Sequence, residues 1–212
     1  MKKDAFERAT GLNVSRETFK RLETYVALVK KWNPAINVVS RKSLDDIWPR
    51  HIVDSVQLFT CIETSKSWLD LGSGGGFPGA VISILANEFS ADTSVTLVES
   101  DQRKSAFLRN VSRETSSDFR VISKRIEQVE PQHADVISAR ALTNLSGLMA
   151  FCERHLNPAG VAIFPKGATW KKEVSEAQRD WQFEVDTITS ITEPQAVILK
   201  IKGIERARSV PS

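Results

Sequence analysis

The sequence predicts an α/β protein with a mainly parallel, Rossmann-like sheet, an N-terminal helical extension and an antiparallel C-terminal hairpin strand. Three observations lead to this prediction. A helical pattern fills about the first sixty residues, and short apolar runs then alternate with helical stretches. Near the C-terminus, two strand-like runs follow each other with no helix between them. Neighbouring strands without a crossover helix pair antiparallel, whereas alternating strands and helices are typical of a parallel sheet.

Two predicted helices make up the N-terminal extension. The first runs from residue 15 to about 33, with Ser15 as its N-cap and Pro34 at its end. Its apolar residues recur at spacings of three and four: Phe19, Leu22, Val26 and Val29. The second begins at the capping-box-like run Ser-Leu-Asp-Asp over 43–46. Its apolar residues are Ile47, Trp48, Ile52, Val56 and Phe59.

The remaining elements are predicted in the order that a doubly wound sheet requires. The strands are expected at 68–71, 95–98, 120–122, 135–137 and 161–164, followed by the hairpin strands 183–191 and 196–201. The helices are expected near 80–89, 102–114, 145–155 and 170–181. We therefore expect a helical extension over 1–62 packed on the core, a Rossmann-like domain over 63–203 and a flexible tail over 204–212.

Composition and charge narrow the class of protein. Of the 212 residues, 41% are apolar and 26% charged, as in a soluble globular protein, and no apolar run approaches the ~20 residues that span a bilayer. The first residues lack the apolar stretch of a signal peptide. Cys61 and Cys152 lie in apolar helical segments, which favours core roles over a disulfide or zinc site. We expect a cytoplasmic protein, a monomer without a membrane partner. The net charge of +3 permits a nucleic-acid partner.

The strongest local motif is a glycine-rich loop after the first core strand, Asp-Leu-Gly-Ser-Gly-Gly-Gly-Phe-Pro-Gly over 70–79. Glycines let a ligand approach the main chain closely, and nucleotide-like ligands bind at this edge of α/β sheets. The dinucleotide fingerprint needs a third glycine where the chain has Phe77, and no Lys-Ser/Thr pair completes a P-loop.

An acid followed by alternating glycines, here Asp70 with Gly72, Gly74 and Gly76, resembles the first motif of the class I methyltransferases. That resemblance implies S-adenosylmethionine as cofactor. Glu99 ends the second core strand, where a carboxylate accepts hydrogen bonds from ribose hydroxyls. This device also occurs in NAD-binding folds, so it supports a nucleoside without choosing between the two.

Further segments resemble one methyltransferase family. Trp-Asn-Pro-Ala-Ile-Asn-Val over 32–38, Arg-His-Ile-Val-Asp-Ser over 50–55, the glycine loop, Val-Ile-Ser-Ala-Arg-Ala over 136–141 and Lys-Gly at 166–167 occur in this order. The ordered set is similar to the small-subunit rRNA guanine-N7 methyltransferases, also called glucose-inhibited division protein B. The resemblance implies methylation of a guanine in the decoding-site loop of 16S rRNA, with 16S rRNA or the small ribosomal subunit as partner.

The resemblance also implies site residues. Gly72 and Phe77 would contact the cofactor, Ile126 and Glu127 would lie beside its adenine, and Arg140 would line the mouth of the pocket. Together with the loop and strand-end residues, the expected cofactor-binding set is Asp70, Gly72, Gly74, Gly76, Phe77, Glu99, Ile126, Glu127 and Arg140.

Guanine N7 carries a free in-plane lone pair, so we expect catalysis mainly by positioning and not by a base or a nucleophile. No Asn/Asp-Pro-Pro-Tyr/Phe motif, crevice-facing cysteine or acid–histidine metal cluster points to another methylation chemistry. Arg140 and Lys166 are the expected catalytic residues, holding guanine O6 or a neighbouring phosphate.

Five basic residues are candidates for RNA contacts: Arg50, His51, Lys124, Arg125 and Lys166. For Arg50 and His51, a buried polar network that ties the N-terminal helices to the core is an equal alternative. Three other functions remain open: a small-molecule methyltransferase, an NAD-linked oxidoreductase, and a non-catalytic RNA-binding module with a vestigial cofactor loop.

Overall fold

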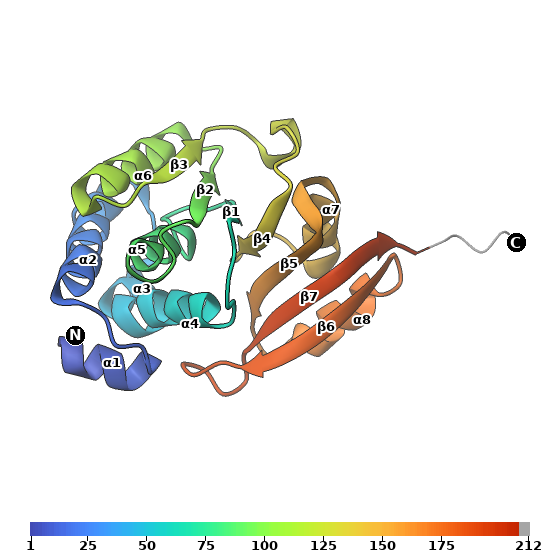
Figure 1. Ribbon diagram of the computed structural model, residues 1–212, viewed down its shortest axis with the longest axis horizontal. Helices are drawn as coiled ribbons and strands as arrows, with labels where there is room; N and C mark the ends of the chain where they lie inside the picture. The colour runs from blue at the N-terminus through green and yellow to red at the C-terminus, as the bar shows by residue number, and fades with distance from the viewer. Residues whose placement is uncertain (208–212) are drawn as a thin grey trace, which may run out of the picture.

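The computed structural model describes residues 1–207 and contains one seven-stranded sheet (Figure 1). The strand order is β3-β2-β1-β4-β5-β7-β6. The strands are β1 (Ser67–Leu71), β2 (Ser94–Val98), β3 (Phe119–Ile122), β4 (Ala134–Ala139), β5 (Leu156–Lys166), β6 (Trp181–Thr189) and β7 (Val197–Arg206). The first five strands are parallel, and β7 runs antiparallel to both β5 and β6. The predicted parallel sheet with an antiparallel terminal hairpin is confirmed.

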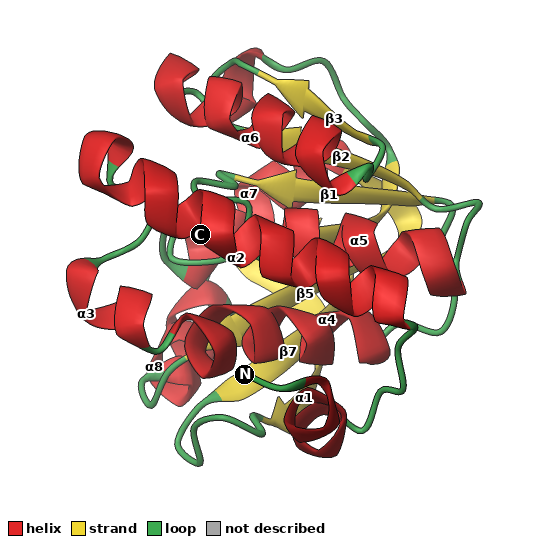
Figure 2. Ribbon diagram, turned by 90° about the vertical axis from the view of Figure 1, so that its left-hand side faces the viewer, coloured by secondary structure: helices red, strands yellow, loops and turns green. Residues whose placement is uncertain are grey.

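Helices cover both faces of this sheet (Figures 1 and 2). The helices are α1 (Lys3–Thr10), α2 (Arg16–Ile36), α3 (Arg41–Asp45), α4 (Asp54–Thr60), α5 (Gly79–Phe89), α6 (Gln102–Thr115), α7 (Leu145–His155) and α8 (Trp170–Ala177). One apolar core joins α5 and α6 to the N-terminal helices, and a second core lies under α7 and α8. Helix α2 packs on the outside of α5 and α6, which adds a layer to one face of the domain (Figure 2). No helix in the described part of the chain is long and apolar enough to cross a membrane.

Helix α2 begins where the sequence predicts but ends later. Ser15 caps its first turn by accepting a hydrogen bond from the Thr18 amide, as expected. The expected end at Pro34 is wrong, because the helix continues to Ile36 and closes at Asn37 in the left-handed conformation. A proline in the last turn removes a single amide donor, which is not enough to end the helix there.

The expected start of the second N-terminal helix is also wrong. Ser40, not Ser43, caps the short helix α3, which stops at Asp45. The chain then forms a π-helical turn, η1 (Trp48–Val53), before it continues as α4. The sequence analysis did not predict α1, whose only buried residue is Phe6, packed against Phe19 and Trp48.

Two boundaries near the C-terminus differ from expectation. Helix α8 stops at Ala177, and Trp181 opens strand β6 instead of closing the helix. Residues 204–206, expected in the flexible tail, lie in β7, while 208–212 fall outside the described residues. The division of the chain into an extension and a core domain stays a prediction.

Candidate active site

The glycine loop between β1 and α5 adopts a conformation that requires glycine at alternate positions. Gly72, Gly74 and Gly76 have φ values of 63°, 55° and 93°, in the left-handed region. A Cβ atom on Gly72 would lie 2.6 Å from Leu142 Cδ1, and one on Gly76 would lie 2.8 Å from the Tyr25 hydroxyl. Both the backbone angles and the close neighbours therefore exclude larger residues.

Asp70, at the end of β1, anchors this loop through its side-chain hydrogen bonds. It is fully buried, and in the sheet it pairs with Ser138 on the neighbouring strand β4. Its Oδ1 accepts from the Ser138 hydroxyl at 2.7 Å, and its Oδ2 accepts from the Gly79 amide at 3.3 Å. Burial raises the pKa of Asp70 to about 6, although these hydrogen bonds oppose the shift. The carboxylate thus holds β1, β4 and the start of α5 together, and its contact with the cofactor stays a prediction.

Glu99 follows β2 and faces the same loop. Its Oε2 accepts from the Gly74 amide at 2.8 Å, and its Oε1 accepts from the Asp101 amide at 2.8 Å. Each carboxylate oxygen has a second lone pair, so these two contacts leave acceptor capacity on both. The carboxylate is therefore fixed in direction before any ligand arrives, and its ribose contact stays a prediction.

A pocket of about 140 Å³ lies beside Gly72. Its apolar walls come from Val98, Ile126, Leu142 and Phe151. The side chains of Lys124, Arg125 and Glu127 also line it. The structure therefore brings the two residues expected beside the adenine, Ile126 and Glu127, to the glycine loop. Lys124 and Arg125, expected to contact RNA, are exposed at the same opening.

The N-terminal extension braces the other side of the loop. Phe77 is 4% exposed, and its ring packs between Tyr25 of α2 and His51 of η1, with ring centroids 5.0 Å and 4.8 Å away. The Tyr25 hydroxyl donates to the Gly75 carbonyl at 2.5 Å. Phe77 thus joins the extension to the loop, and its contact with the cofactor stays a prediction.

Arg140 lies at the end of β4, over this aromatic cluster. Its guanidinium carbon is 5.3 Å from the Phe77 ring centroid. It donates to the Arg50 carbonyl at 3.0 Å and to Nδ1 of His51. His51 is 8% exposed, so the structure places it in the buried network and not at the surface. The Arg50 side chain is exposed, and its contact with RNA stays a prediction.

Arg140 and Lys166 are brought together by the sheet. They line two adjoining hollows of about 210 Å³ and 470 Å³, which also share Pro165 and Gly167. Lys166 forms an ion pair with Glu173 at 2.8 Å, and its side chain is only 10% exposed. Its ammonium is therefore held by a carboxylate from α8, in a hollow that Arg140 also lines.

Three residues of the site were missed by the sequence analysis: Tyr25, Ser138 and Leu142. Ser138 lies in the motif over 136–141, so its position beside Asp70 could have been inferred from strand pairing. Nothing local in the sequence marks Tyr25 or Leu142, because their contacts are made only in the folded chain.

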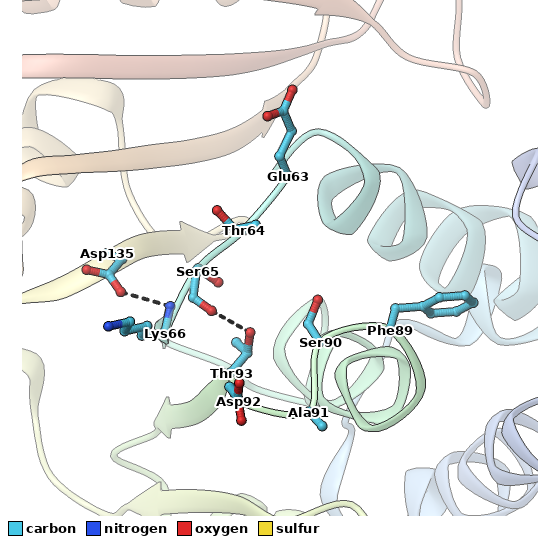
Figure 3. A pocket seen from close by; sticks show the side chains of 10 residues that line it. All are labelled: Glu63, Thr64, Ser65, Lys66, Phe89, Ser90, Ala91, Asp92, Thr93 and Asp135. Atoms are coloured by element: carbon cyan, nitrogen blue, oxygen red, sulfur yellow. Dashed lines mark hydrogen bonds between the residues drawn. The ribbon is translucent and has the colours of Figure 1, made fainter.

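A larger hollow, about 770 Å³, lies at the amino ends of the strands (Figure 3). It is formed before β1, between α5 and β2, and at the start of β4, where Asp135 accepts from the Lys66 amide at 2.9 Å. Parallel α/β sheets bind ligands at the carboxyl ends of their strands. The smaller pockets at that edge, beside Gly72 and Arg140, are therefore the candidate active site.

The family model described as rRNA small subunit methyltransferase G matches residues 18–200. The chain belongs to this family. The Ribosomal RNA small subunit methyltransferase G of Ruegeria pomeroyi is 57% identical over 93% of this chain and 97% of that protein. The protein of the same name from Paracoccus denitrificans is 48% identical over 92% of this chain and 100% of its own length.

Solved structures share the fold at much lower identity. A SAM-dependent methyltransferase from Corynebacterium glutamicum has a TM-score of 0.53 and 14% identity, covering 84% of this chain and 97% of its own. A ribosomal protein methylase from Lactobacillus delbrueckii has a TM-score of 0.57 and 16% identity, covering 72% and 78%. These structures support the class I methyltransferase fold, to which this chain adds its N-terminal helices.

Proposed function

We propose that this protein is an S-adenosylmethionine-dependent methyltransferase that methylates N7 of a guanine in 16S rRNA. By family resemblance the guanine lies in the decoding-site loop, the 530 loop. The observation that carries the proposal is the family match over residues 18–200, which contains both the glycine loop and the two catalytic candidates. We further propose that the enzyme acts in the cytoplasm, as a monomer.

The residues at the loop fit the cofactor. A pocket with apolar walls from Val98, Ile126 and Leu142 suits a flat adenine ring, and the fixed Glu99 carboxylate suits ribose hydroxyls. Gly72 lines the same pocket and has no side chain that would obstruct a ligand there. S-adenosylmethionine supplies an electrophilic methyl group on its sulfonium.

The protein needs to supply orientation more than acid–base chemistry. The guanine N7 lone pair attacks without prior loss of a proton, so alignment and exclusion of water dominate the barrier. Arg140 and Lys166 line the hollows next to the cofactor pocket, where their N–H groups can hold guanine O6 or a phosphate. Arg140 is fixed by two hydrogen bonds of its own, which preorganises it for this contact.

Exposed basic residues at the openings of these pockets suit an RNA backbone. Lys124 and Arg125 lie beside the cofactor pocket, and Arg50 lies beside Arg140. Phosphate contacts of this kind position a nucleic acid without reading its sequence. His51 is not included, because its imidazole is covered.

The test is methyl transfer from labelled S-adenosylmethionine to small ribosomal subunits from a strain that lacks this protein, followed by nucleoside mapping. New 7-methylguanosine in the decoding-site loop is the expected result. Cofactor binding without transfer to RNA would overturn the RNA assignment and leave a small-molecule methyltransferase. Failure to bind S-adenosylmethionine would overturn the proposed class.

A further inference from the structure

The smaller hollow beside Arg140 is lined by two acidic residues, Asp54 and Glu193, and neither belongs to the cofactor pocket. Its walls come from Asp54 and Gln57 of α4, from Arg140 and Lys166 at the strand ends, from the 190–196 segment that joins β6 to β7, and from the start of β7. That segment lies toward α4 in the fold (Figure 1) and is hydrogen-bonded to it. Asp54 is therefore held in the hollow from two sides.

The two oxygens of Asp54 have different environments. Oδ1 accepts from Gln57 Nε2 at 3.1 Å and from the Thr192 hydroxyl. Oδ2 accepts no hydrogen bond from any described residue. Because Asp54 lines the hollow, Oδ2 is the oxygen left to accept from a ligand there.

Asp54 and Arg140 present opposite charges to the same hollow without neutralising each other. Within the described residues they form no ion pair, and Arg140 donates instead to the Arg50 carbonyl and to His51. The negative charge of Asp54 nevertheless acts on the pKa of Arg140, so the two groups are near neighbours. A ligand with donors and an acceptor on adjacent atoms would complement this arrangement.

These groups complement one edge of guanine. Leu142 lines the cofactor pocket, and Arg140, two residues before it in the chain, lines the hollow together with Asp54. Along the rim of guanine, N7 is followed by the acceptor O6 and then by the donors N1–H and the 2-amino group. Adenine presents an acceptor at N1, which would face the carboxylate unfavourably.

We propose that Asp54 determines the base specificity of the enzyme, accepting hydrogen bonds from N1–H and the 2-amino group of the target guanine while Arg140 faces O6. This inference rests on the proposed function. Thr192 and Gln57 act as positioning residues, because their donors hold Oδ1 and leave Oδ2 directed to the base.

The test compares guanine with inosine, which lacks the 2-amino group, at the target position of ligated 16S rRNA assembled into small subunits. For the unaltered enzyme, inosine should lower kcat/KM roughly 10-fold or more, since a hydrogen bond to a charged acceptor is lost. In Asp54→Asn, Thr192 and Gln57 would hold the amide oxygen and turn the amide N–H₂ toward the donors of guanine. We expect kcat/KM on guanine to fall and the guanine-to-inosine ratio to approach one.

Thr192→Val provides a second variant. It should lower the guanine-to-inosine ratio of kcat/KM without changing the charge of the hollow. Asp46→Asn, at an exposed carboxylate outside the hollow, is the matched control and should leave the ratio as in the unaltered enzyme. Equal rates on guanine and inosine for the unaltered enzyme, or an unchanged ratio in Asp54→Asn, would overturn this inference. No transfer to guanine by the unaltered enzyme would overturn the proposed function instead.

Discussion

The Arg140 guanidinium donates a hydrogen bond to Nδ1 of His51, and this contact fixes the tautomer of the imidazole. Arginine has no acceptor, so Nδ1 must carry the lone pair and the ring proton must lie on Nε2. Nε2 is buried and has no partner among the described residues. Burial, and then the charges of Arg140 and Arg50, lower the pKa of His51 to about 3. The imidazole is thus a neutral acceptor that joins η1 to the end of β4.

This protonation state predicts a stability that depends on pH through His51. The unfolded histidine takes up a proton near pH 6.5 and the folded one only near pH 3, so acidification through this window favours the unfolded chain. Between about pH 7 and pH 5 the lost stability should be about 2 kcal/mol. His51→Gln keeps an acceptor for Arg140 but has no imidazole to protonate, so its unfolding free energy should not fall in this way between about pH 7 and pH 5. Urea unfolding of both proteins at the two pH values measures the difference.

Asp70 titrates in the same pH range as His51, so its effect on stability must be separated from that of His51. The pKa of Asp70 is raised from 3.8 in the unfolded chain to about 6 in the folded chain. As the pH falls from about 6 to about 4, the folded chain therefore binds a proton before the unfolded chain does, and this stabilises the fold. The two residues act in opposite directions in the same pH range, and a single curve would not separate them. Parallel stability curves for the unaltered protein and His51→Gln would show that the imidazole is not buried as described.

Arg140→Ala should abolish methyl transfer while the fold is retained. The change removes the donors expected at guanine O6 and leaves Nδ1 of His51 without its partner, which should cost about 1–3 kcal/mol of stability. We expect turnover to fall at least about 100-fold, because removing one preorganised hydrogen-bond donor from a transition state has an effect of this size. Single-turnover transfer to small subunits measures the rate, and S-adenosylmethionine affinity shows whether the cofactor pocket survives. Near-normal turnover would remove Arg140 from the catalytic site.

Asp70→Asn should weaken the loop through its contact with Gly79. The asparagine oxygen can still accept from Ser138, but its N–H₂ would face the Gly79 amide, placing two donors together. We expect a loss of about 1–3 kcal/mol in unfolding free energy and weaker cofactor binding. Combined with Ser138→Ala, the losses should not add, because the two residues share one network. Additive losses would mean that Asp70 does not anchor the loop in this way.

Much of the fold could be predicted because its signals are local. Five apolar runs alternate with helical segments, and the absence of a helix between the last two strands is visible in the sequence. Helix α1 was missed because Phe6 is its only buried residue, and the burial of Phe6 depends on Phe19 and Trp48. The π-helical turn around His51 was missed because the apolar spacing continues through it.

The site was harder to predict, because its contacts depend on register and long-range packing. Asp70 occupies a motif position that indicates a cofactor contact, but the pairing of β1 with β4 places Ser138 beside it. Tyr25 reaches Gly75 from 50 residues earlier in the chain. The sequence predicted a glycine turn at Gly72, which its positive φ confirms, while the neighbours of Gly72 and Arg140 became known only from the fold.

Gly72→Ala tests whether the loop conformation itself is needed for cofactor binding. The new Cβ would lie 2.6 Å from Leu142 Cδ1, and alanine at a φ of 63° is strained by roughly 1 kcal/mol. We expect the affinity for S-adenosylmethionine to fall at least about 10-fold, measured by isothermal titration calorimetry. Adding Leu142→Ala should restore only part of it, since the shorter side chain removes the clash but not the backbone strain, and the pocket loses one apolar wall. Gly203→Ala, at a φ of 60° where a Cβ meets nothing within 4 Å, gives the matched control and should bind the cofactor normally. Unchanged affinity in Gly72→Ala would show that the cofactor does not bind against this loop.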